Sequence, residues 1–293
     1  MNTTEMHIPS NRVSDIERYF HSELDALYGD GEVKMFIRLL FEAFLGWSRA
    51  KLLTHRSDTV NQSDLLRFHW AAEDLKRFRP IQHIIGWTEF CGCRIEVDRN
   101  TLIPRPETEE IVTRAIGLLA AKPPHRILDL CTGSGCIAIA LAKQWPEAEV
   151  WAVDISENAL TVAKRNAQTN NVNVSFLQAD ILRSPFSVPR SPFSLIISNP
   201  PYVMEREKRD MQRNVLDWEP PQALFVPDSD PLLFYRVIAD IAADRLNAGG
   251  MLLLEINGQM GDATLQMLSA KGFAGEIHKD FQGKDRCITA TRR

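Results

Sequence analysis

The chain has 293 residues, of which 44% are hydrophobic and 25% are charged, and its formal net charge is −4. This composition is typical of a globular protein and excludes a largely disordered chain. The acidic balance disfavours nonspecific binding to nucleic-acid phosphates, so we expect no direct nucleic-acid partner. There is no run of about 18 apolar residues, and residues 1–20 lack the pattern of a signal peptide. We therefore expect a cytoplasmic protein without a membrane partner.

Residues 11–80 contain few strand formers, and their apolar residues recur at helical spacing, which predicts a small helical bundle. The recurring positions are Ile16, Tyr19, Phe20, Leu24, Leu27, Met35, Leu39, Leu40, Phe44, Leu65, Leu66, Phe68 and Leu75. Ser14 and Ser63 are candidate caps for these helices, and Gly29 and Gly46 are candidate helix ends. We assign residues 1–81 to an N-terminal helical domain.

The segment 82–112 differs in pattern from the helical domain. Two short strand-like runs around Gly92 predict a β-hairpin, and Pro106 is placed to begin a new helix. We assign residues 82–106 to a hairpin linker and residues 107–293 to a second domain.

The five cysteines are an odd number in a chain of this length and predict reduced thiols. The pair Cys91 and Cys93 lacks the spacing and the companion histidines of a zinc site. We therefore expect no metal.

From His125 onward, apolar strand-like runs alternate with helical segments. The runs are RILDL, EVWAVDI, NVSFLQA, FSLIISN and GMLLLEI. This alternation predicts an α/β domain with a mainly parallel sheet that binds ligands at the carboxyl ends of its strands. We expect the core of the sheet to contain Ile127, Leu128, Leu130, Ile196, Ile197, Leu252, Leu253 and Leu254.

The stretch from Ile127 to Leu141 has the pattern of a strand, a glycine-containing turn and a helix. Gly133 and Gly135 would let the backbone approach a ligand closely, since neither has a side chain in the way. A glycine turn of this length is weak evidence by itself, because such turns also occur without a ligand.

Carboxylates follow three successive strand-like runs and strengthen the case for a nucleotide site. Asp129 lies at the end of the first run, Asp154 at the end of the second, and Asp180 follows the third. Asp154 is placed to accept the two hydroxyls of a ribose, and Asp180 is placed to reach an adenine amino group. Each acid alone could instead be an ordinary helix cap.

The order of these parts resembles that of the class I S-adenosylmethionine-dependent methyltransferases, which have a Rossmann-like, mainly parallel seven-stranded sheet. Cys131 stands where their glycine motif has its first glycine. The G-x-G-x-x-G spacing of a dinucleotide dehydrogenase is absent. The resemblance implies S-adenosyl-L-methionine as cofactor and S-adenosyl-L-homocysteine as product. It implies cofactor contacts from Asp129, Cys131, Thr132, Gly133, Ser134, Gly135, Asp154, Asp180, Ile181 and Asn199.

The fourth strand-like run ends in the sequence SNPPYV, residues 198–203. Two prolines end a strand in any protein, so a simple turn is the alternative reading. An Asn-Pro-Pro-Tyr sequence at this place resembles the motif of methyltransferases that act on planar nitrogens, whose lone pair is delocalised. The Asn199 side-chain oxygen and the Pro200 carbonyl could accept the two N–H hydrogens of such a nitrogen, and Tyr202 offers a flat face. Asn199, Pro200 and Tyr202 are the predicted catalytic residues.

The runs LIPRPETEE (102–110) and GWTEFCG (86–92), together with the helical N-terminal half, resemble the PrmC/HemK family of protein-(glutamine-N5) methyltransferases. The resemblance implies methylation of the glutamine in the Gly-Gly-Gln motif of class 1 peptide chain release factors. It implies a docking role for the helical domain and glutamine contacts from Asn199, Pro200, Pro201 and Tyr202. Arg105 and Glu107 either help to form the substrate pocket or make a structural ion pair.

Three other functions remain open at this point: methylation of a ribosomal-protein glutamine, methylation of an adenine in DNA or RNA, and a noncatalytic cofactor-binding role. The acidic balance and the lack of a basic target-reading region count against nucleic acid. The presence of both Asn199 and Tyr202 counts against a noncatalytic role. We expect a monomeric enzyme.

Overall fold

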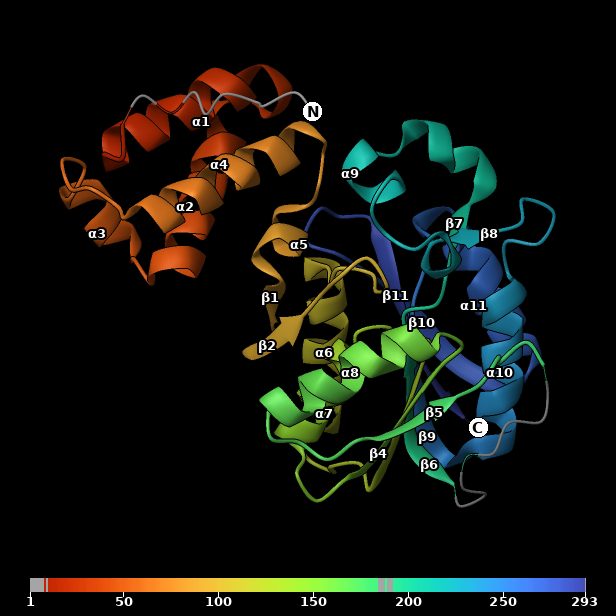
Figure 1. Ribbon diagram of the computed structural model, residues 1–293. Coiled ribbons are helices and arrows are strands. Elements are labelled where there is room, and N and C mark those ends of the chain that lie inside the picture. Colours follow the sequence, from red (N-terminus) through yellow and green to blue (C-terminus); the bar gives the residue numbers. More distant parts are fainter. Residues whose placement is uncertain (1–7, 9, 184–187, 189–191, 293) are drawn as a thin grey trace. The chain divides into compact units, whose positions relative to one another are not determined.

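The structure is a computed structural model that describes residues 8, 10–183, 188 and 192–292. Residues 1–7, part of the segment for which we predict no signal peptide, lie outside the described residues. The chain divides into two compact units (Figure 1): residues 1–86 with 213–218, and residues 87–212 with 219–293. Each unit has its own hydrophobic core.

The first unit is helical, as its apolar spacing predicts. Its helices are α1 (Val13–Tyr28), α2 (Asp30–Leu45), α3 (Arg49–Thr54), α4 (Gln62–Lys76), α5 (Ile81–Ile85) and α9 (Arg213–Leu216). Buried aromatic rings form its centre. The ring centroids of Phe41 and Phe68 lie 4.5 Å apart, and those of Phe20 and Phe68 lie 6.3 Å apart.

The helix ends in this unit were predicted only in part. Gly29 and Gly46 end α1 and α2 with φ angles of 80° and 66°, which confirms the predicted ends. The predicted caps are wrong, because Ser14 and Ser63 lie inside α1 and α4. The cap of α4 is Asn61, whose side-chain oxygen accepts a hydrogen bond from the Asp64 backbone N–H at 2.8 Å.

A short segment from the second half of the sequence belongs to the helical unit. The Trp218 indole N–H donates to the Arg77 carbonyl at 3.1 Å, and the Arg213 guanidinium lies 4.4 Å from the centre of the Phe78 ring. Residues 213–218 therefore belong to the first unit and pack against the segment between α4 and α5, which precedes them by more than a hundred positions.

The second unit begins with a β-hairpin of β1 (Trp87–Phe90) and β2 (Cys93–Glu96). Gly92 takes φ of 69° in its turn, as the predicted hairpin requires. The Asn166 side chain makes two hydrogen bonds to the backbone of Glu96, accepting at 2.7 Å and donating at 3.0 Å. These bonds attach the hairpin to a helix of the same unit.

A seven-stranded sheet forms the centre of the second unit, in the order β10-β11-β9-β6-β3-β4-β5. The strands are β3 (Arg126–Leu130), β4 (Glu149–Asp154), β5 (Ser175–Gln178), β6 (Phe193–Ser198), β9 (Leu246–Glu255), β10 (Phe273–Lys279) and β11 (Asp285–Arg292). Five strands are parallel, while β10 pairs with β11 and β11 with β9 in antiparallel fashion. This arrangement confirms the predicted class I methyltransferase fold.

Helices cover both faces of the sheet (Figure 1). The helices of one face are α6 (Pro106–Leu119), α7 (Cys136–Gln144) and α8 (Glu157–Thr169), and those of the other are α10 (Leu233–Arg245) and α11 (Gly261–Ala270). All eight residues predicted for the sheet core have no exposed surface. Because a parallel sheet is covered on both faces, its five parallel strands are rich in apolar residues, which is why the sequence pattern identified them.

The chain after β6 forms small elements that lie in the second unit. These are the two-stranded ribbon β7 (Val203–Met204) and β8 (Phe225–Val226), and the 3-10 helices η1 (Glu205–Asp210), η2 (Pro221–Ala223) and η3 (Gly258–Met260). Within the described part of the chain, none of the helices combines the length and apolar character needed to cross a membrane.

Candidate functional site

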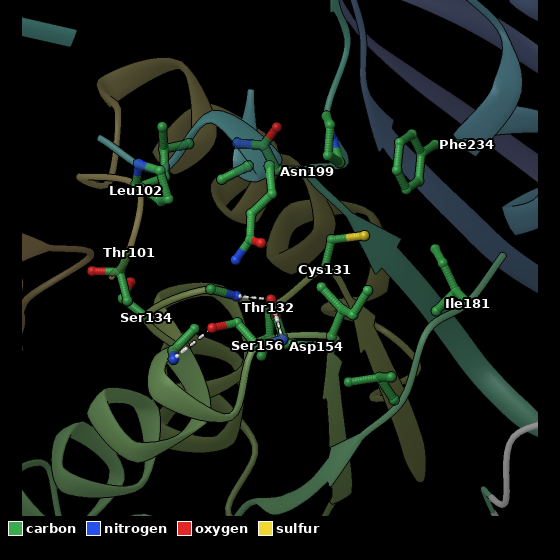
Figure 2. A pocket seen from close by; sticks show the side chains of 18 of the residues that line it. Thr101, Leu102, Cys131, Thr132, Ser134, Asp154, Ser156, Ile181, Asn199 and Phe234 are labelled. Carbon is green, nitrogen blue, oxygen red and sulfur yellow. Dashed lines mark hydrogen bonds between the residues drawn. The ribbon is translucent and has the colours of Figure 1, made fainter. Parts of the chain in front are cut away.

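A cavity of about 380 Å³ lies at the carboxyl ends of the parallel strands in the second unit (Figure 2). Its walls come from segments that are far apart in the sequence: the segment before α6, the loop after β3, the ends of β4 and β5, and the chain after β6. Among its lining residues are Leu102, Thr108, Cys131, Thr132, Gly133, Ser134, Asp154, Asp180, Ile181, Asn199, Pro201, Gln222 and Phe234. The cavity occupies the place where parallel α/β sheets bind their ligands.

The loop after β3 takes left-handed backbone angles, with φ of 61° at Cys131, 54° at Gly133 and 80° at Gly135. Cys131 thus adopts a conformation that glycine adopts more easily. Its side chain lies on the cavity wall, and burial raises the pKa of the Cys131 thiol well above its ordinary value. The thiol is therefore neutral near pH 7 and acts as a small apolar wall.

Asp154 connects this loop to the end of β4. Its carboxylate accepts hydrogen bonds from the backbone N–H of Gly133 at 2.8 Å and of Ser156 at 2.9 Å (Figure 2). Burial raises the pKa of the Asp154 carboxyl, and the backbone N–H donors oppose that shift. Each oxygen keeps lone-pair capacity for a ligand hydroxyl, since a carboxylate has about four acceptor positions.

Asp129 lies beneath the loop and does not line the cavity. It has no exposed surface, and its carboxyl accepts a hydrogen bond from the Thr132 hydroxyl at 2.5 Å. Burial raises the pKa of Asp129 to about 7. The hydrogen bond between Asp129 and Thr132 therefore helps to hold the loop in place.

Two further predicted cofactor residues follow β5, and a third lies away from the cavity. Asp180 and Ile181 both line the cavity. Figure 2 shows Ile181 on the side of the cavity opposite Leu102. Gly135 is absent from the lining and faces α8, where a Cβ added to it would lie 3.0 Å from the Ala163 Cβ. Gly135 thus serves close packing between the loop and a helix.

The Asn-Pro-Pro-Tyr segment follows directly after β6. Asn199 and Pro201 line the cavity, whereas the buried Pro200 and the half-buried Tyr202 are not among its lining residues. The Asn199 side-chain nitrogen donates to the Thr108 hydroxyl oxygen at 3.2 Å. The Tyr202 hydroxyl donates to the Glu255 carboxylate at 2.9 Å. The segment is therefore held at both ends by side chains from other elements.

Arg105 makes an ion pair with Glu219 at 2.5 Å, and the Glu219 side chain is only 1% exposed. Glu219 also accepts a hydrogen bond from the Ile103 backbone N–H at 3.1 Å. These contacts join the segment before α6 to the start of η2, and both contribute residues to the cavity wall. Neither Arg105 nor Glu107 lines the cavity itself.

Sequence reasoning did not single out Thr108, Glu219, Glu255 or Phe234 as site residues. Glu255 ends an apolar strand of the sheet, which is the same signal that identified Asp129 and Asp154. That rule, applied to the run GMLLLEI, could have found it. Glu219 gives no comparable signal, because its partner Arg105 is 114 residues away in the sequence.

Comparisons with known proteins identify the family of the chain. Residues 18–86 match the PrmC N-terminal domain family, and residues 115–217 match the Methyltransferase small domain family. The chain is 39% identical to a release factor glutamine methyltransferase of Flavobacterium psychrophilum, over 96% of this chain and 99% of the relative. It is 40% identical to one of Bacteroides thetaiotaomicron, over 94% and 99%.

A solved structure of the 16S rRNA N2 G1207 methyltransferase of T. thermophilus, in complex with AdoMet and guanosine, shares the fold. Its TM-score is 0.50 at 17% identity, and the match covers 71% of this chain and 50% of that chain. At this identity the likeness concerns the fold alone. The sequence relatives are far closer and extend over almost the whole chain. The chain belongs to the release factor glutamine methyltransferase family.

Proposed function

We propose that this protein transfers the methyl group of S-adenosyl-L-methionine to the side-chain amide nitrogen of the glutamine in the Gly-Gly-Gln motif of class 1 release factors. The product from the cofactor is S-adenosyl-L-homocysteine, and the reaction modulates translation termination. One observation carries the proposal: Asn199 lines the same cavity as the glycine loop and Asp154. Methyl donor and acceptor amide can therefore meet in one place.

The residues around the cavity fit this cofactor. A Cβ added at Gly133 would meet no atom within 4 Å, so the cavity approaches the bare backbone there. Asp154 and Asp180 offer acceptors for hydroxyl or amino groups, and Ile181 and Phe234 offer apolar surface for a ring. When bound, S-adenosylmethionine supplies an electrophilic methyl group on a positively charged sulfur.

The acceptor nitrogen of a glutamine is a weak nucleophile, because its lone pair is delocalised into the carbonyl. In our proposal the Asn199 side-chain oxygen and the Pro200 carbonyl accept its two N–H hydrogens and direct the lone pair toward the methyl group. Tyr202 supports the planar amide. No side chain is assigned as general base, so we expect orientation to supply most of the rate, with a ceiling of roughly 7–11 kcal/mol.

Recognition of a release factor needs more surface than one loop offers, since a stable protein interface commonly buries about 1,200–2,000 Å². We propose that the helical domain, residues 1–81, docks the body of the release factor. Residues 82–106 then link it to the methyltransferase domain, residues 107–293. We further propose that the enzyme works as a monomer in the cytoplasm.

The test incubates the protein with isotopically labelled S-adenosylmethionine and, separately, a class 1 release factor, a ribosomal protein fraction and DNA. We expect label only in the release factor, with mass spectrometry placing one methyl on the Gly-Gly-Gln glutamine. A release factor with that glutamine replaced by asparagine is the matched control. Label in the ribosomal fraction or in DNA, with none in the release factor, would replace the proposal.

A further inference from the structure

A buried hydrogen-bond chain lies behind Asn199 and is not explained by cofactor or substrate contacts. Glu255, the last residue of β9, is 1% exposed. Its carboxylate accepts from the Thr108 hydroxyl at 2.7 Å and from the Tyr202 hydroxyl at 2.9 Å. The Thr108 oxygen in turn accepts from the Asn199 side-chain nitrogen at 3.2 Å. One carboxylate thus connects both functional ends of the Asn-Pro-Pro-Tyr segment.

When Glu255 is ionised, the direction of every hydrogen bond in this chain is determined. A threonine hydroxyl has a single hydrogen, and an ionised carboxylate can only accept. Thr108 must therefore give its hydrogen to Glu255, which leaves only its lone pairs for Asn199. The Asn199 NH2 group then has to face Thr108, and its oxygen has to point the other way.

This direction matters because the two ends of an asparagine amide have nearly the same shape but opposite polarity. With its oxygen toward the acceptor site, Asn199 accepts an N–H hydrogen of the substrate amide. With its NH2 group there, it would present donors to donors and repel the same nitrogen. Asn199 alone has no preference between these orientations.

We propose that Glu255 and Thr108 are positioning residues that set the orientation of the Asn199 amide for methyl transfer. The inference rests on the proposed function. Neither side chain has to touch the reacting atoms. Their contribution is to make the unreactive orientation of Asn199 costly, since it would leave two acceptors, the Asn199 oxygen and the Thr108 oxygen, facing each other without a hydrogen between them.

The chain depends on the ionised form of Glu255. Burial raises the pKa of its carboxyl, while the hydrogen bonds from Thr108 and Tyr202 and the charge of Arg286 oppose the shift. The ionisable and charged groups that act on or near it are Arg286 and Cys287 from β11, Glu107 from α6, Tyr202, and Tyr235 from α10. A protonated Glu255 carries its own hydrogen and can reverse the chain. Activity should therefore fall on the acid side at a pH above the ordinary glutamate value.

The first experiment compares Thr108→Val with Thr108→Ser in the full chain, with unfolding midpoints recorded for each. Valine keeps the shape and removes the hydroxyl, whereas serine keeps the hydroxyl. We expect Thr108→Val to lower kcat at least tenfold, with KM for the release factor and Kd for the cofactor within about twofold. Thr108→Ser should stay within about threefold of the wild type. Thr264→Val is the matched control, because Thr264 is a buried threonine on α11 whose hydroxyl donates to the carbonyl of Met260, the N-cap of the same helix.

The second experiment tests the coupling between Thr108 and Asn199 and the role of the charge on Glu255. In an Asn199→Ala background, Thr108→Val should cause no further loss of kcat, because the side chain that Thr108 positions is absent. Glu255→Gln, which cannot titrate, should have a lower kcat and lose the acid limb of the pH profile. An unchanged kcat in Thr108→Val, an equal loss in Thr108→Ser, or an unchanged acid limb in Glu255→Gln would each overturn the proposal.

A readout without substrate separates this inference from the proposed function. The side-chain amide signal of Asn199 in a ¹⁵N NMR spectrum is assigned by its loss in Asn199→Ala. We expect one of its two protons to move toward the position of a free amide in Thr108→Val but not in Thr108→Ser. If the wild type fails to methylate release factors, the proposed function fails, and this spectrum still decides the orientation of Asn199. Identical spectra for all three proteins would refute the hydrogen-bond chain.

Discussion

Gly133 and Gly135 lie two positions apart in the same loop, yet the structure predicts opposite consequences for replacing them with alanine. At Gly135 the φ angle is 80°, and an added Cβ would lie 3.0 Å from the Ala163 Cβ and 3.2 Å from the Ile139 Cδ1. The left-handed conformation costs about 1–2 kcal/mol for alanine, and overpacking adds about 1–3 kcal/mol. We therefore expect Gly135→Ala to lower the free energy of unfolding by about 2–5 kcal/mol.

At Gly133 the φ angle is 54°, and an added Cβ would meet no protein atom within 4 Å. Only the conformational part of the penalty applies, about 1–2 kcal/mol. Gly133 lines the cavity, however, so the added methyl group would occupy space that the cofactor needs. We expect Gly133→Ala to weaken cofactor binding at least tenfold.

Urea unfolding followed by circular dichroism measures the stability of both variants, and calorimetry with S-adenosylmethionine measures their affinity. The expected result is a crossed pattern: the larger stability loss in Gly135→Ala and, among folded protein, the larger affinity loss in Gly133→Ala. Equal stability losses in the two variants would refute the packing role of Gly135. Wild-type cofactor binding by Gly133→Ala would refute the assignment of this loop to the cofactor.

Three further changes test the site. Asn199→Ala should slow methyl transfer by roughly a hundredfold or more while leaving cofactor Kd nearly unchanged, by analogy with removal of one transition-state hydrogen-bond partner; full activity would reject its role. Asp154→Ala should chiefly raise the Kd for the cofactor, because it removes both a predicted ribose acceptor and the bond to the Gly133 N–H; unchanged calorimetry would remove that assignment. Asp129 has its pKa raised from 3.8 to about 7, so the folded state binds more protons than the unfolded state across that window and stability falls as pH rises through it. Asp129→Asn should weaken this fall, and an identical pH dependence of the unfolding midpoint would contradict the buried carboxyl as its source.

The five parallel strands of the second unit were predictable because each contains a run of apolar residues. The strands β10 and β11, which are richer in polar and charged residues, were not identified by this pattern. Runs such as the one that contains Ile196 and Ile197 are buried on both faces, so their pattern does not depend on distant partners. Helix starts were less predictable. Ser63 and Asn61 are both good caps, and only the extended backbone at Asn61 decides between them.

The candidate site was predictable where one short segment carries the chemistry. Asn199 follows a strand directly, and parallel strands deliver their carboxyl ends to the same edge of a sheet, so it meets the glycine loop. The same rule also selected Asp129, the residue before the last of β3, which is fully buried and is not among the residues that line the cavity. The side chains of Asp129 and Asp154 point in different directions. Side chains alternate between the two faces along a strand, and the turn after the strand sets the direction of its last residues.

The amino-acid sequence by itself determined the class of fold, the strand cores, the glycine loop and the Asn-Pro-Pro-Tyr segment, because each of these is encoded by neighbouring residues. Only the tertiary structure decided which partners hold them. Thr108 meets Glu255 across 147 positions and Asn199 across 91, and Arg105 meets Glu219 across 114. Such contacts form when separate elements pack together, and they leave no period or spacing in the chain that could be read in advance.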